Sequence, residues 1–217
     1  MDYDATRRRM VENQIRTNRV TDPLVIDSMS EVPREVFVPK ELKGIAYVDE
    51  DIPVGRGRFI MEPLVTALLL QTAEIRPDDV VLEIGCTTGY TSVLIARMAS
   101  AVVAVEEDKE LAAYAAQAIR GFGVETVTVA EGRLAEGFPA QSPYDVIIFG
   151  GAITEVPEAI TQQLAEGGRI VAVIASGPGL GKGTLFSRTG GIISRREVFD
   201  AATSMLPGFG RKPMFNF

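Results

Sequence analysis

The sequence predicts an α/β fold in which a mostly parallel β-sheet is covered by helices, carries a C-terminal antiparallel hairpin and follows an N-terminal helical extension. Two observations carry this prediction. Short apolar runs, each too short for a buried helix, alternate with helical patterns after residue 80. The first run, residues 80–84, stops abruptly at Gly85, as a buried strand does before a tight turn.

The N-terminal extension begins with two predicted helices. Residues 4–19 are typical of an amphipathic surface helix, because apolar side chains recur among many charges: Met10, Val11 and Ile15. Thr21 or Asp22 caps a second helix, which has Pro23 in its first turn and ends near Ser30.

A connecting segment follows over residues 32–39, with a brief helical turn predicted at 40–43. Residues 46–59 are rich in Asp, Pro and Gly and predict an irregular loop, with a short β-ribbon as the alternative. Residues 63–75 form a strong helical pattern with many leucines. We expect this extension and its loop to span residues 1–76, and the core to span residues 77–217.

The core is predicted from its alternating elements. Strands are expected at 80–84, 101–106, 125–130, 144–149 and 169–175, and helices at 89–99, 108–121 and 155–165. Gly150-Gly151 ends the fourth strand and Gly167-Gly168 ends the last helix. After a Gly-rich loop at 176–183, residues 184–188 and 192–199 predict an antiparallel pair turned at Gly190-Gly191.

Composition excludes several function classes. Hydrophobic residues make up 46% of the chain, the net charge is −7, and basic residues form no long block, which argues against nonspecific nucleic-acid or membrane binding. The single cysteine, Cys86, excludes an internal disulfide and a multi-cysteine metal site. The absence of histidine removes every Ser–His and Cys–His nucleophilic site. Since neither a signal-peptide pattern nor a membrane-length apolar run is present, we expect a cytoplasmic protein.

A ligand site is predicted where the first strand ends. Gly85 and Gly89 bracket a turn between strand and helix, which brings backbone N–H groups close to a ligand. Glu106 ends the next strand, a position that commonly binds ribose hydroxyls in such folds. Glu83 would repel a pyrophosphate but suits a cationic group. The alternatives are an ordinary packing turn for the glycines and an N–H capping role for Glu83.

The pattern E-x-G-x-x-x-G with an acidic strand end resembles motif I of class I methyltransferases, which use S-adenosyl-L-methionine (AdoMet) and release S-adenosyl-L-homocysteine (AdoHcy). Further motifs resemble the protein-L-isoaspartate O-methyltransferase family, in order over residues 10–200. They are Asp51-Ile52-Pro53-Val54-Gly55-Arg56-Gly57, Glu131-Gly132-Arg133-Leu134, Pro143 to Ile147, Gly151-Ala152, and Leu164 to Arg169. The resemblance implies a Rossmann-like sheet and methylation of damaged aspartyl residues, which is a protein-repair activity.

The resemblance also implies the residues of the site, without a metal and without a named catalytic residue. The cofactor-binding residues would be Glu83, Gly85, Cys86, Thr87, Thr88, Gly89, Tyr90, Glu106, Glu107, Glu131, Gly132, Arg133 and Leu134. The acceptor-binding residues would be Val54, Gly55, Phe59, Ile60, Met61, Gly151 and Ala152. Cys86 is interpreted as a small loop residue against the cofactor and not as a nucleophile.

One element departs from the family pattern. The family carries T-x-S-Q-P where this chain has Phe59-Ile60-Met61-Glu62-Pro63, and its serine sits at the acceptor carboxylate. Met61 cannot donate a hydrogen bond, and Glu62 adds a negative charge. Three hypotheses follow: an isoaspartyl carboxyl methyltransferase with an altered acceptor site, a methyltransferase with another acceptor, and an AdoMet-binding protein without catalysis. A carboxylate acceptor is already a nucleophile, so the first hypothesis needs no general base.

Overall fold

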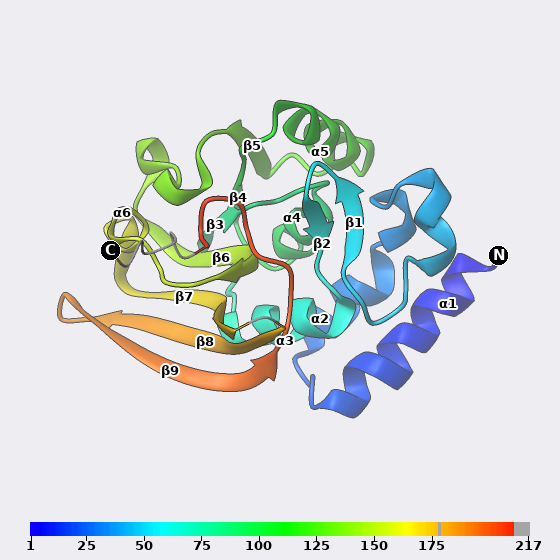
Figure 1. Ribbon diagram of the computed structural model, residues 1–217, viewed down its shortest axis with the longest axis horizontal. Helices are drawn as coiled ribbons and strands as arrows, with labels where there is room; N and C mark the ends of the chain where they lie inside the picture. Colours follow the sequence, from blue (N-terminus) through cyan, green and yellow to red (C-terminus); the bar gives the residue numbers. More distant parts are fainter. Residues whose placement is uncertain (178, 211–217) are drawn as a thin grey trace, which may run out of the picture.

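A mixed seven-stranded sheet lies at the centre of the computed structural model, which describes residues 1–177 and 179–210 (Figure 1). Its strand order is β5 (Val127–Glu131), β4 (Ala101–Glu106), β3 (Val80–Ile84), β6 (Tyr144–Ile153), β7 (Leu164–Gly177), β8 (Leu180–Thr189) and β9 (Ile192–Ala201). The first five strands of this order are mutually parallel, and β8 and β9 are antiparallel to their neighbours. The predicted α/β class and the C-terminal hairpin are confirmed.

The strand order reverses at β3, which pairs in parallel with both β4 and β6. From β3 the chain builds outward through β4 to β5, and it then returns to the other side of β3 to form β6 and β7. In open α/β sheets ligands bind in the crevice at such a reversal, outside the carboxyl ends of the strands. This position coincides with the loop at residues 85–89.

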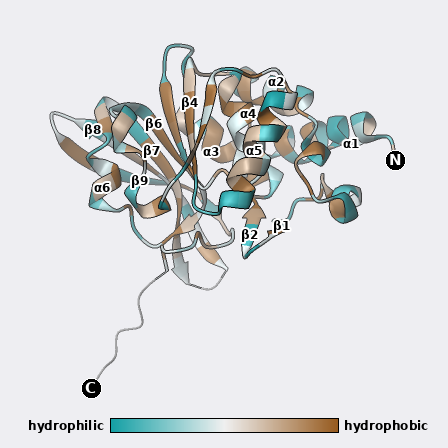
Figure 2. Ribbon diagram, turned by 90° about the horizontal axis from the view of Figure 1, so that it is seen from above, coloured by the Kyte–Doolittle hydropathy of each residue, from teal (hydrophilic) through white to brown (hydrophobic). Residues whose placement is uncertain are grey.

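The two faces of the sheet have separate hydrophobic clusters, because successive strand residues point to opposite sides. Val81 faces a cluster shared with α1 (Tyr3–Met10), α2 (Pro23–Glu31), α3 (Pro63–Ala73), α4 (Tyr90–Ala96) and α5 (Lys109–Gly121). Leu82 faces a second cluster containing Ile160 of α6 (Glu158–Thr161) together with Leu206 and Phe209. Figure 2 shows the apolar strands lying among the surrounding helices.

The N-terminal extension follows its sequence signals closely. Met10, Val11 and Ile15 are buried, and α1 continues into a π-helical turn, Val11–Ile15, and a 3₁₀ turn, Arg16–Asn18. The Asp22 carboxylate caps α2 by accepting from the N–H of Leu24 at 2.8 Å. Further 3₁₀ turns occupy Arg34–Val36 and Lys40–Ile45, and the loop before α3 contains an antiparallel ribbon of β1 (Ile52–Gly55) and β2 (Arg58–Ile60).

The prediction of a helix over residues 155–165 is wrong. Only the four residues Glu158–Thr161 are α-helical, and β7 begins at Leu164 and runs through Gly167-Gly168. Pairing of the chain with β6 decides this, because the N–H of Tyr144 donates to the carbonyl of Gln163 and Leu164 lies in register with Tyr144. Gly167 has a φ of +76° and lies where the register of the two strands shifts, so it serves an irregular strand and not a helix end.

Other strand boundaries also differ from prediction, by one or two residues at β5 (Val127–Glu131) and at the end of β9, and by more at β6, β7 and β8. Strand β6 runs on through Gly150-Gly151 to Ile153, because Ala152 and Ile153 pair with Val173 and Ile174 of β7. Ala152 also exchanges backbone hydrogen bonds with Ser204 and Leu206. Strand β7 ends at Gly177 and strand β8 begins at Leu180, so most of the loop expected at 176–183 is part of these strands. Residues 205–210 dock on the sheet, while 211–217, including the apolar tail 213–217, lie outside the described residues. Within residues 1–177 and 179–210, every helix falls short of the length and apolarity that a membrane crossing requires.

Candidate cofactor and acceptor site

The loop after β3 is fixed to the end of the neighbouring strand β4. Its first two N–H groups, those of Gly85 and Cys86, both donate to the carbonyl of Val105, at 2.8 and 3.2 Å. Gly85 has a φ of +83°, and Gly89, with a φ of +90°, precedes the first residue of α4. These values explain why glycine occupies both ends of the loop, since L-residues rarely adopt them.

Glu106 lies at the carboxyl end of β4, where the sequence placed it, and its side chain is buried. One carboxylate oxygen, Oε1, accepts from the N–H groups of Glu107 and Asp108 at 3.0 and 3.2 Å. The other, Oε2, accepts from the N–H of Thr87 and from the guanidinium of Arg58, both at 2.9 Å. Glu106 therefore joins the glycine loop, the start of α5 and the β1–β2 ribbon.

The middle of the loop carries backbone strain. Thr87 has a φ of +51°, which is unfavourable for a β-branched residue, and its hydroxyl donates to the carbonyl of Cys86 at 2.8 Å. The N–H group of Thr87 points at Glu106, so the strained conformation supplies one of the carboxylate's hydrogen bonds. The Oγ1 atom of Thr88 is buried without a hydrogen-bond partner among the described residues.

Glu83 lies beneath this loop and not at its open edge. Its carboxylate accepts a hydrogen bond from the hydroxyl of Ser92 in α4. Burial raises the pKa of Glu83 to about 7, and the hydrogen bond from Ser92 opposes that rise. The Glu83 carboxyl group therefore changes its protonation state near neutral pH, and it does so directly beneath the glycine loop.

Two predicted loop residues face the interior. Burial raises the pKa of the Cys86 thiol, which therefore stays protonated and is a poor nucleophile. The ring of Tyr90 packs edge-on against Phe37, with centroids 5.6 Å apart, and lies under the guanidinium of Arg34. Tyr90 thus contributes its side chain to the N-terminal core.

The predicted cofactor-binding residues 131–134, at the end of β5 and just after it, lie beside Glu106 and contact it through the backbone. The N–H of Gly132 donates to the carbonyl of Glu106 at 3.1 Å. Glu131 and Arg133 are exposed and pair with Lys109 and Glu136, both at 3.3 Å. Glu107 is also exposed, whereas Leu134 belongs to the second hydrophobic cluster. Exposed polar side chains here border the edge at which Glu106 lies.

The predicted acceptor residues are only partly brought together. Phe59 and Met61 line one small cavity, which residues 203–206 also border. Gly151 and Ala152 meet the same segment, since a Cβ on Gly151 would lie 2.9 Å from the carbonyl oxygen of Ser204. Val54 and Gly55 instead line a separate cavity of about 330 Å³ beside α5, and Ile60 is part of the core.

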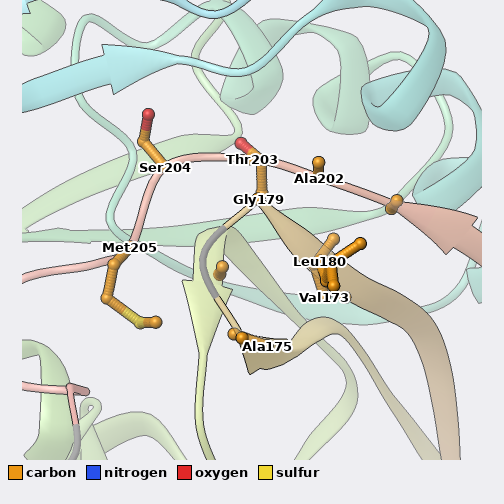
Figure 3. A pocket seen from close by; sticks show the side chains of 12 residues that line it. Val173, Ala175, Gly179, Leu180, Ala202, Thr203, Ser204 and Met205 are labelled. Carbon is orange, nitrogen blue, oxygen red and sulfur yellow. The ribbon is translucent and has the colours of Figure 1, made fainter.

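A third cavity, of about 280 Å³, lies at the ends of β7 and β9 (Figure 3). Small side chains such as Ala175 and Ala202 line it. Thr203, Ser204 and Met205 border both this cavity and the small one beside Met61, so the two are neighbours. The small cavity, at about 10 Å³, holds about one water, so the room for an acceptor side chain lies in the neighbouring cavity of about 280 Å³.

The structure adds three residues that the sequence analysis did not assign to the site: Asp51, Arg58 and Leu206. The Asp51 carboxylate accepts from the N–H of Ser204 at 2.7 Å and from the N–H of Glu62 at 2.9 Å. These bonds tie the 203–206 segment to the acceptor loop, which comprises residues 46–62 before α3. Asp51 stood in a recognised motif, but its partner lies 153 residues away in the sequence. Arg58 directly follows the same motif, but its partner Glu106 lies 48 residues away in the sequence, so no local signal marked the pair.

The residues at the sheet edge fit the cofactor once two side chains move. A Cβ on Gly85 would lie 2.8 Å from Nη2 of Arg58 and 2.8 Å from Cδ2 of Leu206. The space over Gly85 is therefore filled by the ends of two flexible side chains and not by backbone. Glu106 supplies the acceptor oxygens that ribose hydroxyls need. In the part of the chain that the structure describes, acidic residues and cysteine form no cluster capable of holding a metal ion.

Comparison with known proteins gives consistent matches. The profile of the protein-L-isoaspartate(D-aspartate) O-methyltransferase family matches residues 5–194. The chain is 39% identical over 177 residues to a protein-L-isoaspartate O-methyltransferase of Methanoculleus marisnigri, with 80% of each chain covered. It is 36% identical over 174 residues to protein-L-isoaspartate O-methyltransferase 1 of Rhodopseudomonas palustris, covering 80% of this chain and 71% of that protein.

Solved structures agree with these matches. A protein-L-isoaspartate O-methyltransferase superimposes with a TM-score of 0.81 at 25% identity, covering 93% of this chain and 66% of the longer solved chain. A putative protein-L-isoaspartate O-methyltransferase from Plasmodium falciparum, solved in complex with S-adenosyl-L-homocysteine, superimposes with a TM-score of 0.78 at 20% identity and covers 95% of this chain. The second likeness concerns the fold.

Proposed function

Because this chain belongs to the protein-L-isoaspartate(D-aspartate) O-methyltransferase family and is thus an AdoMet-dependent methyltransferase, we propose that it methylates a carboxylate of damaged aspartyl residues in proteins or peptides. One observation carries the proposal. The carboxyl end of β4, where Glu106 lies, and the cavity beside Met61 are adjacent, and Arg58 contacts both. Arg58 thus lies between the candidate cofactor site at Glu106 and the candidate acceptor cavity beside Met61.

The cofactor would be held by residues at the carboxyl edge of the sheet. Glu106 would accept hydrogen bonds from the ribose, with residues 131–133 beside it. The N–H groups of Gly85, Cys86 and Thr87 already donate within the protein, so the loop at 85–89 would contribute the close approach of its backbone at Gly85 and not these donors. When bound, AdoMet supplies an electrophilic methyl group on a sulfonium. The work of the protein is then to orient the acceptor oxygen and exclude water.

The small cavity suits an acceptor that needs no proton removed. Its lining, all within the described residues, contains no carboxylate, and the chain has no histidine. A hydroxyl or amine acceptor would need a general base there, whereas a carboxylate is nucleophilic as it stands. The hydroxyl of Thr203 already donates to the Asp51 carboxylate at 2.8 Å, so it is Ser204, which also borders the cavity, that could replace the hydrogen bond that a serine at position 61 would give.

A different acceptor is favoured by one observation. Met61 is buried and its neighbour Glu62 faces Asp49 and Asp51, so burial and like charges raise the pKa of Glu62 to about 7. An ionised Glu62 would repel an anionic peptide approaching this side of the loop. A smaller or less charged acceptor would avoid that repulsion.

The test uses methyl-labelled AdoMet with an isoaspartyl peptide and its normal aspartyl twin, and it measures base-labile label on the peptide. Label on the isoaspartyl peptide alone would support the proposal. Met61→Ser is run alongside, with Met98→Ser as its matched control, because Met98 is equally buried but lies away from the cavity. Cofactor binding without label in wild type would reject isoaspartyl specificity, and activity gained only by Met61→Ser would place the acceptor at residue 61.

Three further expectations belong to the same proposal. The acceptor loop lies in an N-terminal extension, residues 1–76, and AdoMet binds to the core over 77–217. A cytoplasmic location agrees with a single buried cysteine, which requires no oxidising compartment. The net charge of −7 disfavours nucleic acid as the partner.

A further inference from the structure

Arg58 is a buried cation with one ionic partner among the residues that the structure describes. Its side chain is 4% exposed and that of Glu106 is 1% exposed, and Nη2 of Arg58 lies 2.9 Å from Oε2 of Glu106. A guanidinium has five N–H donors, of which the contacts among the described residues use only those of Nη2. The Nε atom is buried and has no partner in this part of the chain. Arg58 is therefore a buried guanidinium with N–H groups that donate to no acceptor among the described residues.

The unused donors belong to a residue that lines the small cavity. Arg58 borders it together with Phe59, Met61 and Ser204, and it is the only charged residue in that lining within the described chain. The remaining contributors are glycine, apolar or hydroxyl side chains. The cavity, at about 10 Å³, has room for about one water, so an anion enters only as the Arg58 side chain moves off Glu106. It would then find one cation and no carboxylate in the lining. Guanidinium groups bind carboxylates through two parallel hydrogen bonds, which gives both strength and orientation.

Arg58 also stands in the way of the cofactor. The four hydrogen bonds to Glu106 occupy both of its oxygens, and Nη2 of Arg58 fills space over Gly85. The three backbone donors are fixed by the fold, whereas Arg58 is a flexible side chain. A ribose hydroxyl can therefore reach Glu106 most readily by taking the position of Arg58.

We propose that Arg58 is the specificity-determining residue for the acceptor, and that it exchanges Glu106 for the acceptor's carboxylate when the cofactor binds. This inference rests on the proposed carboxyl methyltransferase function. The exchange keeps both buried charges partnered, Glu106 by ribose hydroxyls and Arg58 by the acceptor, and an unpartnered buried charge is costly. It also makes cofactor binding precede acceptor binding.

The transfer step then returns Arg58 to its first partner. An oxygen of the acceptor carboxylate forms a bond to the methyl carbon while the carbon–sulfur bond breaks, and that electron pair stays on sulfur. No proton moves. The acceptor becomes a neutral ester and the sulfonium a neutral thioether, so Arg58 loses its anionic partner at the acceptor. The guanidinium is again attracted to Glu106, which favours release of both products.

The experiment compares wild type with Arg58→Met, Arg58→Lys and a matched control, Arg56→Met. Arg56 is on the same ribbon but exposed, and it pairs with Asp108 and Glu110 at the surface. Calorimetry measures AdoHcy binding without a peptide. With AdoHcy present, it then measures binding of an isoaspartyl peptide and of a neutral twin carrying the amide in place of the carboxylate. Initial rates give kcat and KM for the isoaspartyl peptide.

We expect Arg58→Met to bind AdoHcy as tightly as wild type or up to about 10-fold more tightly, because the competing ion pair is gone. Its KM should rise about 10- to 100-fold, as expected for loss of a charge-assisted hydrogen bond, with a much smaller change in kcat. It should also lose the preference for the carboxylate peptide over its amide twin. Arg58→Lys should recover part of that preference, and Arg56→Met should behave as wild type.

AdoHcy binding weakened about 10-fold in Arg58→Met would overturn the proposal, because Arg58 would then support the cofactor. An unchanged KM in Arg58→Met, with wild type active, would overturn it while the proposed function stands. Absence of label with wild type would reject the proposed function itself. If Arg58→Met does not fold, Arg58→Gln carries the same comparison, since its amide can still donate to Glu106.

Discussion

The guanidinium carbon of Arg34 lies 4.9 Å from the ring centroid of Tyr90, at the first turn of α4. Arg34 is fully buried and has no carboxylate partner among the described residues. Its Nε donates to the carbonyl of Ala46 at 2.8 Å, and its Nη2 donates to the carbonyl of Met61 at 2.7 Å. Arg34 thus connects the acceptor loop to the helix that follows the glycine loop, through carbonyl groups and a π-face.

Arg34→Met should destabilise the protein by about 3 kcal/mol, because the carbonyls of Ala46 and Met61 lose their charged donor inside the core. Urea unfolding at neutral pH measures the change. Arg196→Met, at an exposed position on β9, is the control and should change the free energy of unfolding by less than about 0.5 kcal/mol. Equal small effects in both variants would show that the buried guanidinium contributes no net stability.

Gly150→Ala should be among the most disruptive small substitutions. A Cβ at this position would lie 2.3 Å from the carbonyl oxygen of Gly85, which is backbone and cannot move without displacing the cofactor loop. We expect a loss of more than about 3 kcal/mol of stability and weaker AdoHcy binding. Gly44→Ala is the control because its Cβ would meet nothing within 4 Å. Thermal unfolding with and without AdoHcy distinguishes the two variants.

Glu83→Gln should remove a pH dependence of stability. The folded pKa of about 7 exceeds the ordinary value of 4.5, so the folded protein keeps a proton that the unfolded chain releases between these values. The free energy of unfolding of the wild type should therefore fall, relative to the variant, as pH rises from about 4.5 to about 7, by up to about 3 kcal/mol. The glutamine can still accept from Ser92.

Denaturant titrations of both proteins at pH 5 and pH 8 check this expectation. Glu125→Gln, at an exposed carboxylate just before β5, is the control and should follow the wild type. A constant difference between wild type and Glu83→Gln at the two pH values would contradict the assigned titration.

Thr87→Gly should be neutral or stabilising by up to about 1 kcal/mol. The φ of +51° costs threonine about 1 to 2 kcal/mol, which offsets the greater flexibility of glycine in the unfolded chain. Thr91→Gly, within the helix α4, should instead destabilise by about 1 kcal/mol or more. Urea unfolding of both variants tests the difference in sign. Equal losses would mean that the loop carries no strain at Thr87.

Local patterns were sufficient for most of the fold. The apolar runs that became β3 and β4 were predicted with their observed bounds, since burial on both faces leaves an uninterrupted apolar signal. Asp22 and Pro23 marked the start of α2 by their own chemistry. The helix expected at 155–165 failed because strand pairing with β6 outweighed a helical pattern.

The sequence by itself determined the parallel core, the glycine loop and the acidic residue that ends β4, because each depends on neighbours within a few residues. Only the tertiary structure decided which groups meet Glu106 and Gly85. Arg58 lies 48 residues from Glu106, and Leu206 lies more than a hundred residues from Gly85. Such pairs form when the β1–β2 ribbon and the 203–206 segment pack over the sheet edge. A local sequence pattern does not indicate which distant side chain will lie over Gly85.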